Sequence, residues 1–302
     1  MERNAVPADV RLVEGTRRTD ILDIASRELK DFWKGEGRVL LCVSKGGATR
    51  DGFTIRKKGQ DMELSSASDR GVLYAAYDLL RRQQTGDLLS DGAVVTEMPS
   101  YDIRILNHWD NPDGTVERGY AGRSIWRWDE LPETVSPLYE EYARANASVG
   151  INAVVLNNVN AKPQMLSTGM LRKVAVIADV LRPYGIRTYL SVNFASPKAL
   201  GELPTADPLD ADVQRWWKKK TKEIYCLIPD FGGFLVKANS EGEPGPQDYG
   251  RTHADGANML AGILAPHGGV VMWRAFVYQA SSLDRACQAY EEFMPFDGQF
   301  HE

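Results

Sequence analysis

The chain contains few cysteines, no long apolar run and no excess of positive charge. Its three cysteines, Cys42, Cys226 and Cys287, are odd in number and far apart, which is typical neither of a disulfide framework nor of paired zinc ligands. We therefore expect buried free thiols in a reducing compartment. Residues 1–15 lack the apolar core of a signal peptide, and no stretch is long and apolar enough for a transmembrane span. We expect a cytoplasmic protein, or a secreted one if a leader has been lost.

Acidic side chains outnumber basic ones, 41 to 36, which gives a formal net charge of −5. This balance argues against nucleic acid or an anionic membrane as a partner. No two of the histidines stand at the spacing of metal ligands, so we expect no metal site. The sequence also has no glycine-rich phosphate loop and no nucleophile elbow, so we expect no cofactor.

The length of 302 residues predicts about two domains. Within residues 1–98, the apolar periodicity indicates two amphipathic helices, Asp20–Lys34 and Asp69–Gln84. Short strands are expected at 38–43, 52–56 and 62–65. This pattern predicts a small α+β domain. It contains no catalytic constellation, so we expect it to act as a scaffold.

From residue 99 onward, apolar strands alternate with helical segments, which indicates a parallel sheet. The expected strands are 103–107, 152–156, 187–192, 233–238 and 270–274, and the expected helices are 136–148, 171–181, 212–228, 253–264 and 284–293. The alternation predicts a (β/α)8-type TIM barrel. A complete barrel takes about 250 residues, so we expect residues 99–302 to form about five β/α units. Such a partial catalytic barrel is either truncated or completed by another segment.

The fourth of these strands ends in charged residues. The apolar run Phe234–Val236 is followed by Lys237, and Glu241 lies in the glycine- and proline-rich loop beyond it. The carboxyl ends of parallel barrel strands are where such folds place their chemistry. A cation and a carboxylate at this position are therefore candidate site residues, although most loop glutamates are simply solvated.

Three stretches carry a resemblance to a known family. These are KANSEGEPGP at 237–246, NHWD at 107–110 and WRAF at 273–276. They resemble family 67 of the glycoside hydrolases, the α-glucuronidases that remove glucuronic acid from xylan fragments. The resemblance is densest over 101–298 and implies glucuronoxylan-derived oligosaccharides as substrates. It also implies that full-length relatives form homodimers through a C-terminal region that is absent from this chain.

The resemblance assigns Glu241 as the general acid of an inverting hydrolysis. Glycoside hydrolysis requires a carboxylic acid for the leaving oxygen and a second carboxylate across the sugar ring. The family's base lies in later barrel strands, so the resemblance names no base among these residues. Glu243, two positions further into the loop, is the carboxylate to compare with Glu241.

The other family positions describe a pocket for a uronate. Lys237 and Arg274 match residues that hold the substrate's carboxylate, Trp109 matches one that lines the pocket, and Val159 matches an apolar wall. Considered without the resemblance, the alternative for each cation is an ion pair in the barrel core, which explains Arg274 equally well. The alternative for Trp109 is a plug between the barrel and the front domain, but the cost of leaving a tryptophan half-exposed favours the pocket. Val159 alone indicates nothing.

Two other functions compete with an α-glucuronidase that removes α-1,2-linked (4-O-methyl)glucuronic acid. One is a non-catalytic uronate-binding fragment that lacks the base. The other is a hexosaminidase-type enzyme, which expects an aspartate before the acidic glutamate, where this chain has Ser240. The sequence determines neither the methyl preference nor the oligosaccharide length. Trp126 and Trp128 indicate an exposed aromatic loop, at a sugar site or an interface.

Overall fold

The computed structural model describes residues 2–44, 51–275, 287 and 290–291. The chain forms two compact units, each assembled from several segments. The first comprises Met1–Ile105, Pro137–Asn152 and Val180–Ile186, and the second comprises Leu106–Ser136, Ala153–Asp179 and Arg187–Glu302. The expected boundary between residues 98 and 99 remains a prediction. The expected helix at 284–293 lies almost entirely outside the described residues.

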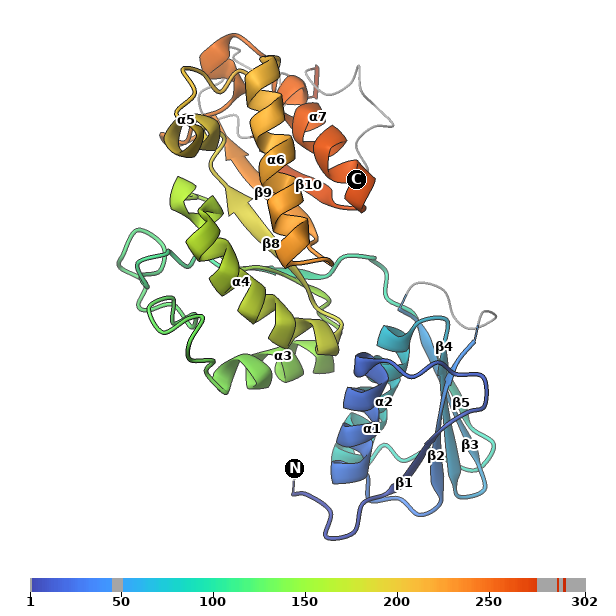
Figure 1. Cartoon of the computed structure of the whole chain (residues 1–302). Coiled ribbons are helices and arrows are strands. Elements are labelled where there is room, and N and C mark those ends of the chain that lie inside the picture. The colour runs from blue at the N-terminus through green and yellow to red at the C-terminus, as the bar shows by residue number, and fades with distance from the viewer. Residues whose placement is uncertain (1, 45–50, 276–286, 288–289, 292–302) are drawn as a thin grey trace. The chain divides into compact units, whose positions relative to one another are not determined.

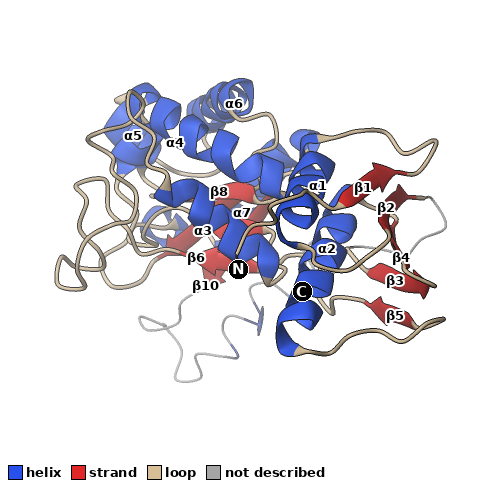
Figure 2. Cartoon of the chain, turned by 90° about the horizontal axis from the view of Figure 1, so that it is seen from below, coloured by secondary structure: helices blue, strands red, loops and turns tan. Residues whose placement is uncertain are grey.

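The first unit contains a five-stranded sheet covered by helices. Its strands are β1 (Asp9–Leu12), β2 (Arg38–Val43), β3 (Phe53–Lys58), β4 (Asp61–Ser66) and β5 (Val94–Glu97), in the order β1-β2-β4-β3-β5. The strands β1, β2 and β4 run parallel, whereas β3 is antiparallel to both of its neighbours. Helices α1 (Asp20–Phe32) and α2 (Asp69–Thr85) lie on one face of the sheet (Figures 1 and 2). The predicted α+β layer of two helices on a sheet is confirmed.

Capping interactions explain where these two helices begin and end. The hydroxyl of Thr19 accepts a hydrogen bond from the Leu22 amide, and that of Ser68 accepts one from Gly71, which satisfies amides that have no partner within the helix. Gly86 ends α2 in the left-handed region at φ +75°, a conformation that glycine adopts without steric cost. The strands β1 and β5, which the sequence did not predict, are four-residue edge strands with largely exposed side chains.

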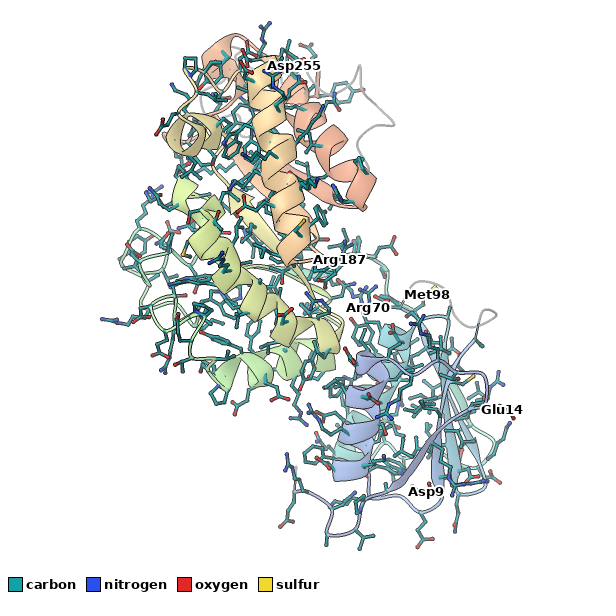
Figure 3. The ribbon with its side chains drawn as sticks, in the orientation of Figure 1. Asp9, Glu14, Arg70, Met98, Arg187 and Asp255 are labelled. Carbon is teal, nitrogen blue, oxygen red and sulfur yellow. The ribbon has the colours of Figure 1, made fainter. Side chains whose placement is uncertain are left out.

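A buried carboxylate cross-links distant segments of the first unit. Asp51, 3% exposed, accepts hydrogen bonds from Arg70 (2.9 Å), Arg104 (2.8 Å) and Asn152 (3.2 Å). Figure 3 labels Arg70 at the start of α2. Burial acts to raise the pKa of Asp51, but the two guanidinium groups outweigh it and lower the pKa below its ordinary value.

The second unit is a partial TIM-type barrel. Its strands β6 (Ile105–Asn107), β7 (Ala153–Val155), β8 (Arg187–Val192), β9 (Gly233–Ala238) and β10 (Val270–Ala275) lie side by side in chain order. The pairs β7–β8, β8–β9 and β9–β10 are parallel. Helix α4 (Thr168–Leu181), α5 (Ser196–Gly201) with α6 (Ala211–Leu227), and α7 (His253–Leu264) connect successive strands from β7 onward. Helix α3 (Leu138–Ser148), between β6 and β7 in the chain, is grouped with the first unit. The predicted fold class is confirmed.

The two ends of this sheet differ in what they carry. At the amino ends, Arg187 donates to the carbonyls of Asp230 and Phe231, which ties the start of β8 to that of β9. At the carboxyl ends, the loops lead into the helices, and Asp255 closes a capping box with Thr252 at the start of α7. Arg187 and Asp255 mark these two ends in Figure 3. All six residues of β9 are buried, as expected for a parallel strand covered on both faces.

Two expectations about buried and exposed side chains were wrong. Cys226 and Cys287 are exposed and Cys42 is half-buried, whereas buried thiols were expected. Trp126 and Trp128 are buried, at 1% and 3% exposure, rather than part of an exposed aromatic loop. Trp126 packs against the His108 ring at 5.3 Å between centroids. None of the described helices is long and apolar enough to cross a membrane.

Candidate active site

Lys237 lies at the centre of the site, at the carboxyl end of β9. Its side chain is 2% exposed, and its ammonium donates to Asn160 Oδ1 at 2.7 Å and to Glu241 Oε2. The Glu241 carboxylate is 47% exposed. A buried strand therefore presents a cation to a solvent-facing carboxylate, and the two residues that the sequence singled out at this strand end are in direct contact.

The loop that carries Glu241 has a tightly constrained backbone. Asn239 and Glu241 occupy the left-handed region at φ +49° and +50°, a conformation that costs free energy for residues other than glycine. The turn is closed by a hydrogen bond from the Glu243 amide to the Ser240 carbonyl at 2.9 Å. A Cβ on Gly245 would lie 2.0 Å from Asn239 Oδ1, so the loop closes only with glycine there.

Asp248 fastens the far side of this loop. Its Oδ1 accepts from the Asn239 side chain and its Oδ2 from the Gly245 amide, both at 3.0 Å. The Asn239 Oδ1 in turn accepts from the Gln247 amide at 3.0 Å. Asp248 had no assigned role from the sequence. The structure shows that it orders the segment between Lys237 and α7.

The two glutamates of the loop lie in opposite electrostatic environments. The hydrogen bond from Lys237 lowers the pKa of Glu241 below its ordinary value, and Arg118 adds to this effect. Burial raises the pKa of Glu243, although Lys237 and Lys162 counteract it, and Asn193 donates to its Oε2 at 3.2 Å. In the structure without substrate, Glu243 is therefore the carboxyl that retains its proton to higher pH.

A second loop reaches the same carboxylate from the end of β6. Arg118 lies 3.4 Å from Glu241 Oε1. The preceding residue, Glu117, is in the left-handed region at φ +59°. Its carbonyl accepts from the side-chain amides of Asn111 (2.8 Å) and Asn158 (3.0 Å). Two buried asparagines thus hold a strained peptide in place, and the cation of Arg118 follows directly after it.

The sequence identified neither Arg118 nor the amides that position the loops. In the NNVN stretch after β7, the sequence singled out only Val159. Its neighbours make the contacts to other segments: Asn158 donates to the Glu117 carbonyl, and Asn160 accepts from Lys237. A cluster of asparagines directly after a buried strand is the signal that would have found them. Side-chain amides at strand ends commonly satisfy loop backbone groups.

The remaining predicted residues are placed as follows. Arg274 on β10 is the register neighbour of Lys237 on β9, and side chains at the same level of adjacent strands point to the same face of a sheet. Trp109, at the end of β6, is 36% exposed, and Val159 is 1% exposed. His108 contacts Asp110 at 3.1 Å, so these two residues pack together on the other side of the chain from Trp109.

Residues 83–302 match the model of the glycosyl hydrolase family 67 middle domain. The chain belongs to this family. The probable alpha-glucuronidase A of Neosartorya fischeri is 48% identical over 259 residues, and the alpha-glucuronidase A of Aspergillus tubingensis is 45% identical over 259 residues. Both alignments cover 83% of this chain and 30% of the relative. The chain therefore spans about a third of the length of these family members.

Solved structures of glycosidases share the fold at low sequence identity. A GH138 enzyme targeting pectin rhamnogalacturonan II superposes with a TM-score of 0.61 at 15% identity, over 95% of this chain and 37% of that one. A GH115 4-O-methyl-alpha-glucuronidase gives 0.54 at 12% identity, over 88% and 40%. The GH20 beta-N-acetylhexosaminidase of Streptomyces coelicolor gives 0.58 at 11%, over 98% and 72%. At these identities the likeness concerns the fold alone.

Proposed function

We propose that this chain carries the acid and the uronate-binding groups of an α-glucuronidase. The observation that carries the proposal is the buried Lys237 ammonium, which is held at the carboxyl end of β9 beside the exposed Glu241. Family membership and relatives named alpha-glucuronidase A support the same activity. The proposed substrates are xylan-derived oligosaccharides that bear α-1,2-linked glucuronic or 4-O-methylglucuronic acid.

The substrate carboxylate is proposed to bind between Lys237 and Arg274. These residues are register neighbours on β9 and β10, and two cations are the partners that a buried carboxylate requires. The exposed part of Trp109 offers an apolar face to the sugar ring. Val159, whose side chain is buried, is proposed to form the apolar wall of the site.

Glu241 is proposed to protonate the leaving oxygen, in a hydrolysis that inverts the anomeric centre. Its exposed carboxylate reaches solvent and substrate, whereas that of Glu243 is held by Asn193. The raised pKa of Glu243 makes it the competing acid. Replacing each glutamate by glutamine separates the two assignments, because an amide cannot donate the catalytic proton.

The second candidate function is uronate binding without hydrolysis. The observation that favours it is the ion pair with Lys237, which lowers the pKa of the proposed acid Glu241. An inverting hydrolysis also needs a second carboxyl group about 6.5–9.5 Å from the acid to activate water, and the resemblance names no residue of this chain as that base.

One preparation distinguishes the two functions. The 302-residue chain is titrated with glucuronate and with xylose, and it is then incubated with an aldouronic acid while released glucuronate is measured. Binding of glucuronate with release supports the hydrolase, and binding without release supports the uronate-binding segment. Equal affinity for glucuronate and xylose would contradict both.

A further inference from the structure

Lys237 and Glu241 differ in their freedom to move. The lysine stem belongs to a strand whose six residues are all buried, and its ammonium is also tied to Asn160 at 2.7 Å. The Glu241 carboxylate lies on a loop and is 47% exposed. If an anionic ligand competes with Glu241 for the Lys237 ammonium, we expect the ammonium to stay in place and the Glu241 carboxylate to move.

The ion pair conflicts with the role of an acid. A general acid must hold its proton until the leaving oxygen needs it. The hydrogen bond from Lys237 instead favours the ionised form of Glu241, and Arg118 acts in the same direction from the β6 loop. Glu243, on the same loop, interacts with both this ammonium and Lys162, which follows β7. Arg274 lies at the same level as Lys237 on the adjacent strand β10. The ion pair therefore favours the ionised form of Glu241, which cannot act as an acid.

We propose that a uronate carboxylate binding at Lys237 takes over the ammonium from Glu241, and that Glu241 then takes up a proton and becomes the acid. This inference rests on the proposed function, because it requires Lys237 to bind the uronate. The charges balance. One uronate anion and one proton from solvent enter the site, Lys237 exchanges one carboxylate partner for another, and Glu241 becomes neutral.

Proton uptake does not require Glu241 to leave entirely. An ammonium has three donors, so two carboxylates can share it. Two carboxylates at close range raise each other's pKa, which favours protonation of one of them. The uronate is bound between two cations, whereas Glu241 faces solvent and the more distant Arg118, 3.4 Å away. Glu241 is therefore the group that accepts the proton.

This coupling makes the charged sugar a condition of the chemistry as well as of binding. A neutral glycoside that occupied the site would leave Lys237 paired with Glu241. The carboxylate would then stay ionised and could not protonate a leaving oxygen. Selection for uronates would thus act at the proton-transfer step, even against a neutral sugar that binds.

Calorimetric titration of the 302-residue chain with glucuronate tests the coupling. The titration is repeated at one pH in buffers of different protonation enthalpy, between about pH 5 and about pH 7, where free glucuronate is ionised. We expect uptake of up to about one proton per glucuronate and a Kd that rises by up to about tenfold per pH unit. Methyl glucoside, the neutral control, should show no uptake.

Two matched variants locate the proton. Glu241→Gln should bind glucuronate without proton uptake, and Glu243→Gln should retain it. Glucuronate binding without uptake by the unaltered chain would overturn this inference and leave the proposed function standing. Uptake lost in Glu243→Gln but kept in Glu241→Gln would overturn it by placing the proton on Glu243. Failure to bind glucuronate at all would overturn the proposed function and this inference with it.

Discussion

Replacing Lys237 by methionine should weaken uronate binding strongly while leaving the fold in place. Methionine has a similar length and no charge, and it would occupy a strand position whose side chain is 2% exposed. Exchange of a buried ion-pair member for an apolar residue destabilises mainly when it leaves a buried charge unpaired. Glu241 is half-exposed and remains solvated, so we expect the melting temperature to stay within about 4 °C.

The loss of affinity follows from the charge that the substrate carboxylate would no longer meet. Removing one partner of a buried, hydrogen-bonded charge pair costs about 2–5 kcal/mol. This corresponds to an increase in Kd for glucuronate of about 30-fold to about 5,000-fold. Arg274, the register neighbour on β10, would remain, so the lower part of this range is expected. Binding of neutral xylose should change little.

Calorimetric titration with glucuronate and with xylose, on the unaltered chain and on Lys237→Met, measures this difference. Lys198→Met serves as the matched control, because Lys198 lies exposed on α5. Should Lys237→Met keep its preference for glucuronate over xylose, the ammonium would be a structural partner of Asn160 and Glu241 only, and the uronate-binding proposal would fail.

Three further predictions concern the proposed acid Glu241, the first unit and the loop that carries Glu241. Glu241→Gln should slow hydrolysis of an aldouronic acid far more than that of a glucuronide with an activated leaving group, which needs no proton. Asp51→Asn should lower the free energy of unfolding by about 3–5 kcal/mol near neutral pH, since it breaks a buried charge cluster. Gly245→Ala should disorder the loop and weaken glucuronate binding, because the new Cβ would meet Asn239 at 2.0 Å. Gly262→Ala, on α7 with open space around it, should leave binding unchanged.

Each of these has a measurement that decides it. Equal slowing of both substrates would remove Glu241 from the acid role. The lowered pKa of Asp51 means that its contribution is complete above the ordinary carboxyl pKa and is lost as pH falls through the folded-state pKa. The difference in urea midpoint between Asp51→Asn and the unaltered chain should therefore shrink below about pH 4. A difference independent of pH, or normal glucuronate binding by the Gly245→Ala variant, would contradict the structural reasoning.

Buried parallel strands were the part of the fold that the sequence predicted best. The bounds expected for β8 and β9 match the structure, because both strands are rich in β-branched, aromatic and aliphatic residues and a glycine marks the turn before each of them. The bounds of α7 match as well, since Thr252 and Asp255 form its capping box. The edge strand β1 was missed, because its alternation of polar and apolar residues extends over only four positions.

The centre of the site was predictable and its surroundings were not. Lys237 and Glu241 lie on one strand and its loop, so their spacing in the sequence already placed them together. Arg118 contacts Glu241 from the loop after a different strand, and no local sequence pattern predicts a contact between two loops. The burial of Trp126 likewise depends on packing against His108, which composition does not reveal.

The framework around Glu241 is built largely from side-chain amides. The side chains of Asn111 and Asn158 donate to the Glu117 carbonyl, and Asn160 accepts from Lys237. Asn239 accepts from the Gln247 amide within the loop that carries Glu241. An amide neither gains nor loses a proton across the range in which glutamates titrate. Mild acidification therefore changes the charge of the proposed catalytic groups without changing the charge of these amides. Asp248, which accepts hydrogen bonds from Asn239 and Gly245, is the carboxylate in this framework. The loops should keep one geometry from mildly acidic to neutral solution, so that an activity profile against pH reports protonation of the glutamates rather than collapse of the site.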